Sequence, residues 1–112
     1  MKKCGVIMLF FDLPMGNKEQ RKVYRNLIKN LKICGFVFMQ ESVYVKEVGN
    51  IKLKNEEVNK IRSFAPNEGS IYCIFLTLEQ FKRMKTITGE NFVFDDTKNK
   101  EICIINWKNA KN

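Results

Sequence analysis

Residues 4–14, which decide the fold, read CGVIMLFFDLP. The first eight of them are apolar or small at both parities, which is typical of a central strand covered on both faces. Asp12 ends the apolar run, and Leu13-Pro14 stops the strand because proline cannot donate to a strand ladder. The sequence therefore predicts a buried first strand that ends on a carboxylate.

A helix is predicted directly after this strand, over about residues 18–33. Asn17 with Gln20 three residues later resembles a capping box, and Gly35 fits a left-handed helix stop. Residues 36–39 and 42–45 are then strand-like, either as one bulged strand or as two short strands. The periodicity leaves both arrangements open.

The second half of the chain predicts further elements. A helix is expected from about residue 55, with a start as early as residue 51 still open, to about 65, before Pro66. A strand follows over 70–77, and Thr77 with Gln80 can cap a short helix to about Lys85. Segments 92–94 and 102–107, on either side of a turn at 95–96, indicate a final strand or hairpin.

This order of elements predicts an α+β fold, a ferredoxin-like sandwich of strand, helix, two strands, helix and strand, with an extra C-terminal strand. The 112 residues suffice for a single domain and are too few for two. Two helices can cover only one face of the sheet. The other face is still apolar through the first strand, and a homodimer is the simplest cover for it.

Charge points to the partner class. Twenty Lys and Arg against twelve Asp and Glu give a net charge of +8, which attracts polyanions and makes nucleic acid the leading partner. An alternative is that the lysine surplus reflects an A+T-rich genome. Histidine is absent, so Ser/His/Asp triads, Cys/His nucleophile pairs and histidine-bearing zinc sites are excluded.

The four cysteines form no metal or redox motif. They are 30 residues or more apart, without a Cys-x-x-Cys pair, and three lie in apolar strand-like runs. We therefore expect buried, reduced thiols in a cytoplasmic protein. The short apolar run near the N-terminus lacks a cleavage site, and no stretch approaches the roughly 18 apolar residues of a membrane span. The four residues are Cys4, Cys34, Cys73 and Cys103.

Five cations of the first predicted helix recur at spacings of 4, 3, 4 and 3. On a helix this spacing confines them to an arc of about 80°. A solvated amphipathic face is the alternative, but such faces usually mix charges, and Glu19 is the only acid between residues 18 and 41. We favour a phosphate-binding surface, which gives affinity without base specificity. The five are Lys18, Lys22, Arg25, Lys29 and Lys32.

Asp12 is the candidate catalytic and metal-binding residue. It is a carboxylate at the end of an apolar strand, and Mg²⁺ is often held by only one or two carboxylates together with substrate phosphates. The alternative is that Asp12 is simply a polar residue at the end of a strand. A single carboxylate is too few for a metal site, but two copies of Asp12 at a dimer axis would provide enough ligands. Asp95-Asp96 is explained by a surface turn. The paired phenylalanines at 36 and 38 and at 92 and 94 are assigned to packing.

Several phrases together resemble a known family. They are Phe10-Phe11-Asp12-Leu13-Pro14, then Arg21 and Tyr24, then Gly35-Phe36, and above all QESVY at 40–44. They resemble the small CRISPR-associated adaptation endonuclease, the second of the two universal spacer-acquisition proteins, in its type II branch. The detailed match spans about residues 6–45.

The resemblance implies a ferredoxin-like homodimer that sits between integrase subunits and helps hold duplex DNA for insertion. It also implies a Mg²⁺-dependent endonuclease in which two copies of Asp12 share the metal. By the same match, Arg21 joins the nucleic-acid-binding residues, Ser42 and Tyr44 lie at the dimer interface, and residues 90–107 contact the partner subunit. Leu13-Pro14-Met15 adds no metal ligand, so DNA scaffolding is favoured over nuclease activity.

Two further hypotheses stay open at this stage. One is a stand-alone metal-dependent ribonuclease of a related toxin-like family. The other is a dimeric interaction module without a nucleic-acid role.

Overall fold

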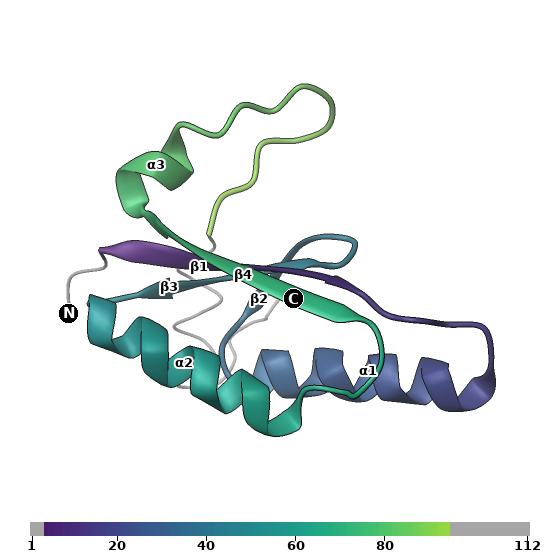
Figure 1. Ribbon diagram of the computed structural model, residues 1–112. Helices are drawn as coiled ribbons and strands as arrows, with labels where there is room; N and C mark the ends of the chain where they lie inside the picture. The colour runs from purple at the N-terminus through teal and green to yellow at the C-terminus, as the bar shows by residue number, and fades with distance from the viewer. Residues whose placement is uncertain (1–3, 95–112) are drawn as a thin grey trace, which may run out of the picture.

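The computed structural model describes residues 4–94 and confirms the predicted α+β, ferredoxin-like architecture. Its four strands form an antiparallel sheet in the order β2-β3-β1-β4. Helices α1 and α2 cover one face of the sheet, while α3 and the segment after it rise from the other (Figure 1). The elements are β1 (Gly5–Asp12), α1 (Lys18–Ile33), β2 (Val37–Gln40), β3 (Val43–Val48), α2 (Ile51–Phe64), β4 (Ser70–Thr77) and α3 (Leu78–Lys82).

The predicted signals fix both ends of α1. The Asn17 side chain accepts a hydrogen bond from the Gln20 backbone N–H at 2.8 Å, and the Gln20 side chain reaches back to the Asn17 N–H at 3.2 Å. Gly35 has a φ of +93°, the left-handed conformation that glycine adopts at little cost. The capping box and the glycine stop are both confirmed.

The open question at residues 36–45 is settled as two strands joined by a tight turn. β2 and β3 pair antiparallel, with a register shift between Phe38 and Gln40. Helix α2 takes the earlier of its two possible starts, at Ile51. Helix α3 ends at Lys82 rather than near residue 85, because the chain leaves the helix after its cap at Arg83.

The predicted strand at 92–94 is wrong. Phe92 and Phe94 carry no strand pairing and instead pack their rings against Phe81 of α3, with centroids 6.1 and 5.6 Å away. Ring pairs in such tilted and edge-to-face arrangements are favourable, and here they cover the cluster of Val6 and Met8. The predicted turn at 95–96, the predicted strand at 102–107 and Cys103 lie outside the described residues.

The alternating side chains of β1 build two cores, one on each face of the sheet. Ile7, Leu9 and Phe11 pack with Leu27 and Leu31 beneath the helices. Val6 and Met8 point the other way, into a smaller cluster with Val45 and Phe81. β1 is therefore buried on both faces from Gly5 to Leu9, as its composition predicted, whereas Phe10 near its end is exposed.

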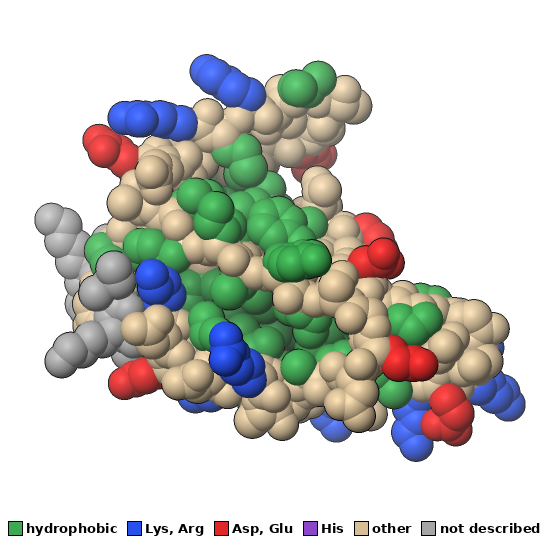
Figure 2. All heavy atoms as spheres, in the orientation of Figure 1, with side chains coloured by type: hydrophobic (Ala, Val, Ile, Leu, Met, Phe, Trp, Pro, Cys, Tyr) green, Lys and Arg blue, Asp and Glu red, His purple; other side chains and the backbone are tan. Residues whose placement is uncertain are grey.

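We call the sheet face opposite α1 and α2 the open face, because its cover is incomplete. The α3 segment covers Val6 and Met8. Phe10, Tyr72 and Ile74 keep 39, 68 and 47% of their surface exposed. Figure 2 shows hydrophobic side chains gathered over β4, between α2 and the α3 segment. The described part of the chain therefore covers only part of this face of the sheet.

The prediction that the cysteines are buried is wrong for two of the three described ones. Cys4 and Cys73 are exposed, and Cys34 is half-buried. Cys73 lines an apolar hollow of about 170 Å³ between β4 and α2, since the helix does not close over the edge strand. Phe38 likewise is 54% exposed, because it stands on the edge strand β2, whereas Phe36 is buried as predicted.

Within residues 4–94, no helix has the length and apolar character that a membrane span needs.

Candidate nucleic-acid interface and carboxylate site

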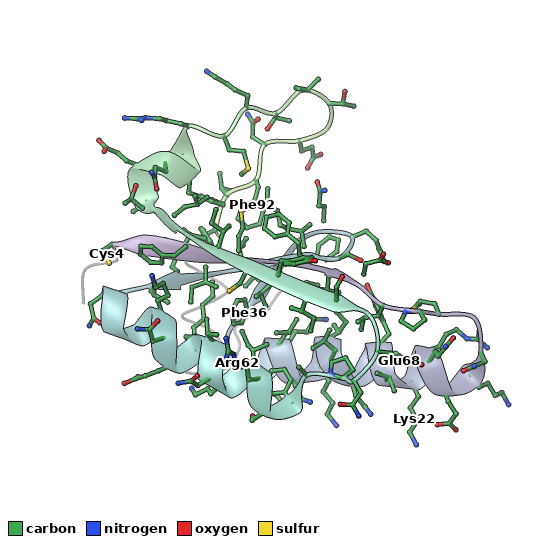
Figure 3. The ribbon with its side chains drawn as sticks, viewed as in Figure 1. Cys4, Lys22, Phe36, Arg62, Glu68 and Phe92 are labelled. Atoms are coloured by element: carbon green, nitrogen blue, oxygen red, sulfur yellow. The ribbon has the colours of Figure 1, made fainter. Side chains whose placement is uncertain are left out.

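The five predicted cations of α1 form one exposed row, which we call the basic ridge (Lys18, Lys22, Arg25, Lys29, Lys32). The opposite side of the helix carries Leu27 and Leu31, which are 2 and 0% exposed in the core. Burial of this apolar stripe fixes the rotation of the helix, so the ridge must face solvent. In Figure 3, Lys22 points away from the sheet.

The ridge is free to bind an anion. No ion pair engages any of its cations among residues 4–94, where the recorded pairs join only Lys46 and Lys60 to Glu57. Arg21, one turn from the ridge, is also exposed, but its Nη1 donates to the Met15 carbonyl at 3.2 Å and so braces the β1–α1 loop. The arrangement leaves a strip of positive charge along α1, with Glu19 as the acid of its first turn.

Asp12 is the last residue of β1 and is exposed. It pairs with Ser70 across β4 and has the parity of Val6 and Met8, so it stands at the end of the open face. Gly69 lies directly against it. Gly69 has a φ of +83°, and a Cβ atom added to it would lie 2.5 Å from the Asp12 carbonyl oxygen. The strand end is thus held closely from the β4 side.

The Asp12 carboxylate has no hydrogen bond or ion pair with any described residue. Within the described part of the chain, no three acidic or cysteine side chains gather as a metal site. A free oxygen ligand suits Mg²⁺, which takes one or two protein carboxylates and completes its shell with water and phosphate. Asp12 offers one ligand of this kind, and no pair of acidic or cysteine side chains joins it within residues 4–94.

The β2–β3 turn holds the other side of the strand end. Ser42 adopts a φ of +64°, a left-handed conformation that is uncommon for a residue other than glycine. Its carbonyl accepts a hydrogen bond from the Phe11 N–H at 3.0 Å, which continues the β1–β3 ladder by one residue. Next to it, Glu41 Oε2 accepts a bond from the Tyr24 hydroxyl at 3.1 Å.

Three aromatic rings lie under this turn. The Phe11 centroid is 5.9 Å from both Tyr24 and Tyr44. Burial raises the pKa of Tyr24 above its usual value; a hydrogen bond with Ser42 opposes this shift and Glu41 adds to it. Burial also raises the pKa of Tyr44, with smaller contributions from Tyr24 and Glu41. Both phenols therefore stay protonated at neutral pH.

Residues 6–84 match the family model described as CRISPR associated protein Cas2. The chain belongs to the Cas2 family. A relative from Ligilactobacillus salivarius is 38% identical over 84 residues, which cover 75% of this chain and 83% of the relative. Relatives from Treponema denticola (35% over 85 residues; 76 and 84%) and Streptococcus mutans (34% over 84 residues; 75 and 78%) are similar. All three are named CRISPR-associated endoribonuclease Cas2. The predicted resemblance is confirmed at the level of the family.

Of the residues predicted for this Cas2-family chain, the structure separates two groups. The basic ridge runs along the outer side of α1, and Asp12 stands at the end of the sheet. Ser42 joins Asp12 through the Phe11 backbone. Tyr44 is only 5% exposed and lies in the protomer's own core, which leaves little of its surface for a second subunit.

Sequence reasoning missed Glu41 and Gly69. Glu41 lies inside the QESVY motif. Its hydrogen bond with Tyr24 could not be predicted, because it depends on the position of the β2–β3 turn relative to α1. Gly69 directly precedes β4, and its close approach to the Asp12 backbone depends on the pairing of β4 with β1. Such contacts join segments far apart in sequence and leave no local pattern.

Proposed function

We propose that this Cas2-family protein acts in the cytoplasm as a homodimeric CRISPR adaptation subunit, which binds duplex DNA and holds it for a partner integrase. The observation that carries the proposal is the basic ridge, with five exposed cations on one helix face and no acid paired to them among residues 4–94. Lysines and arginines in a row along a rigid helix contact successive phosphates and fix the register of a duplex.

We propose that a second copy covers the open face of the sheet. Phe10, Tyr72 and Ile74 expose apolar surface on a sheet that the α3 segment leaves uncovered. Self-association there would bury this apolar surface and would leave the basic ridge of each copy exposed on the outer side of its α1 helix. We also propose that residues beyond 90, as far as 107, extend this contact with the partner subunit.

Charge reversal tests the DNA-binding role. We expect the triple variant Lys22→Glu, Arg25→Glu and Lys29→Glu to lose duplex DNA binding in a titration by fluorescence anisotropy. A matched control reverses three cations outside the ridge (Lys82, Arg83 and Lys85), and it should bind within about three-fold of wild type. Asp12→Ala should also bind normally. Equal losses in both triple variants would show that net charge, rather than the ridge, governs binding.

Salt dependence measures the contacts directly. Neutralising the same three ridge residues to Gln should lower the slope of log K against log salt by about 2.7 for each protomer in contact, since each phosphate contact contributes about 0.9. A slope that does not change would mean that the ridge does not touch the DNA backbone.

A second function is favoured by the free carboxylate of Asp12. We propose that two copies of Asp12 meet across the dimer and bind Mg²⁺, with RNA as the substrate in keeping with the names of the relatives. The ion, when bound, activates water and stabilises negative charge on the phosphoryl group. Asp12 would hold it at the open face, while Gly69 and Ser42 keep the strand end in place.

Cleavage of RNA and duplex DNA separates the two functions. Wild type should cleave single-stranded RNA with Mg²⁺ and not with EDTA, and Asp12→Asn should abolish cleavage while leaving duplex binding unchanged. Cleavage that survives in EDTA or in Asp12→Asn would rule out this site. Binding without any cleavage would leave the adaptation role and remove the nuclease role.

A further inference from the structure

We propose that Tyr24 and Glu41 are positioning residues for Asp12, acting through the β2–β3 turn. This inference rests on the proposed nuclease function. It assigns a role to a hydrogen bond between α1 and a turn 17 residues further along the chain.

The contacts form one continuous path. The Tyr24 hydroxyl donates to Glu41 at 3.1 Å, and Glu41 precedes Ser42 in the turn. The Ser42 carbonyl accepts the Phe11 N–H at 3.0 Å, and Phe11 precedes Asp12. Each step is either a hydrogen bond or a peptide bond, so a movement of the Glu41 side chain shifts the backbone that presents Asp12.

The strained turn explains why such a brace is needed. A serine with a φ of +64° is strained relative to extended backbone, and such a conformation persists only when the surrounding contacts hold it in place. The Ser42 carbonyl is held by Phe11 on one side, and its neighbour Glu41 is held by Tyr24 on the other. Without the second anchor, the turn is free to relax and to release the Phe11 N–H.

The aromatic cluster keeps the donor in place. Tyr24 packs against the Phe11 ring at 5.9 Å, and that ring packs against Tyr44. Truncation of only the hydroxyl, as in Tyr24→Phe, keeps these ring contacts and removes the hydrogen bonds of Tyr24 with Glu41 and Ser42, both of which belong to the turn. Removal of this one oxygen atom therefore tests the contact with the turn without disturbing the packing of the rings.

Hydrogen exchange of backbone amides gives a readout that needs neither metal nor cleavage. In Tyr24→Phe and in Glu41→Ala, the Phe11 amide should exchange about five-fold faster, the effect of one lost hydrogen bond, while the Met8 and Val45 amides in the centre of the sheet stay unchanged. Glu41→Gln keeps an acceptor oxygen and should protect Phe11 nearly as well as wild type. Glu56→Ala, an exposed acid on α2, is the matched control and should change nothing.

Cleavage assays with the same variants test the functional half. Tyr24→Phe and Glu41→Ala should each lower the Mg²⁺-dependent rate by about five-fold, the double variant by no more than either single one, and Glu41→Gln should restore it. Unchanged Phe11 exchange would overturn the brace itself. Faster exchange with an unchanged cleavage rate would overturn its link to Asp12. A wild type that never cleaves would overturn the proposed nuclease and, with it, the positioning role, while the exchange data would still report the brace.

Discussion

Lys46→Met should destabilise this protein more than any single change at its surface. Lys46 lies on β3 beneath the helices, and its Nζ donates to Glu57 Oε2 of α2 at 2.8 Å and to the Cys34 carbonyl at the end of α1 at 2.6 Å. Glu57 is 7% exposed, and its Oε1 has no partner in the described structure. One ammonium group therefore neutralises a buried acid and ties the sheet to both helices.

The magnitude follows from what the substitution leaves behind. Glu57 would stay buried with neither oxygen well paired, since Lys60 lies 4.0 Å away with a side chain 60% exposed. Removing one partner of a buried ion pair costs about 3 kcal/mol or more, a large part of the total stability of a domain of this size. The double variant Lys46→Met with Glu57→Leu removes the charge as well as its partner. It should therefore lose only about 1 kcal/mol, mainly for the unpaired Cys34 carbonyl.

Urea unfolding followed by circular dichroism measures both free energies at fixed protein concentration. Lys60→Met is the matched control, because it removes an exposed cation from the same acid and should cost less than about 1 kcal/mol. If Lys46→Met unfolded within 1 kcal/mol of wild type, Glu57 would not depend on this lysine. If the double variant were as unstable as the single one, the loss would come from packing and not from the orphaned charge.

Three further outcomes are expected. Gly69→Ala should cost at least about 2 kcal/mol in urea unfolding, because its φ is +83° and a Cβ would meet the Asp12 carbonyl. Asn17→Ala should cost about 1 kcal/mol by losing its bond to Gln20, with the helix content measured by circular dichroism. Burial raises the pKa of Tyr24 in the folded protein. The stability that its protonated phenol contributes is therefore fully present below pH 10 and is lost as the pH rises further. The alkaline loss of stability should be smaller in Tyr24→Phe.

The fold could be predicted from the sequence because its signals are local. A capping box, a glycine stop and a run of apolar residues each act within a few positions of themselves, and α1 and β1 follow them closely. The segment at 92–94 was mistaken for a strand. Phenylalanines at alternate positions are typical of a strand, but they also suit an irregular segment that packs its rings over a sheet. The choice between the two depends on Phe81, which lies eleven residues before Phe92 and packs against both phenylalanine rings.

The two candidate sites differ in how much of each could be predicted from the sequence. The basic ridge is a helical periodicity, so it was predicted in full and the structure places it on the exposed side of α1. The surroundings of Asp12 come instead from three strands and a turn. The contacts of Ser42 with Phe11 and of Gly69 with Asp12 depend on strand register, which no residue in β1 specifies by itself.

The parity of β1 connects the two sites. Phe11 points to the helix side, where it packs on Tyr24 of the same helix that carries the basic ridge. Asp12, one residue later, belongs to the open face. Successive side chains of a strand point to opposite faces, so these two neighbouring residues serve different sides of the sheet. The ring of Phe11 therefore anchors the end of β1 to the helix that carries the basic ridge, while the carboxylate of Asp12 stands on the other face of the sheet.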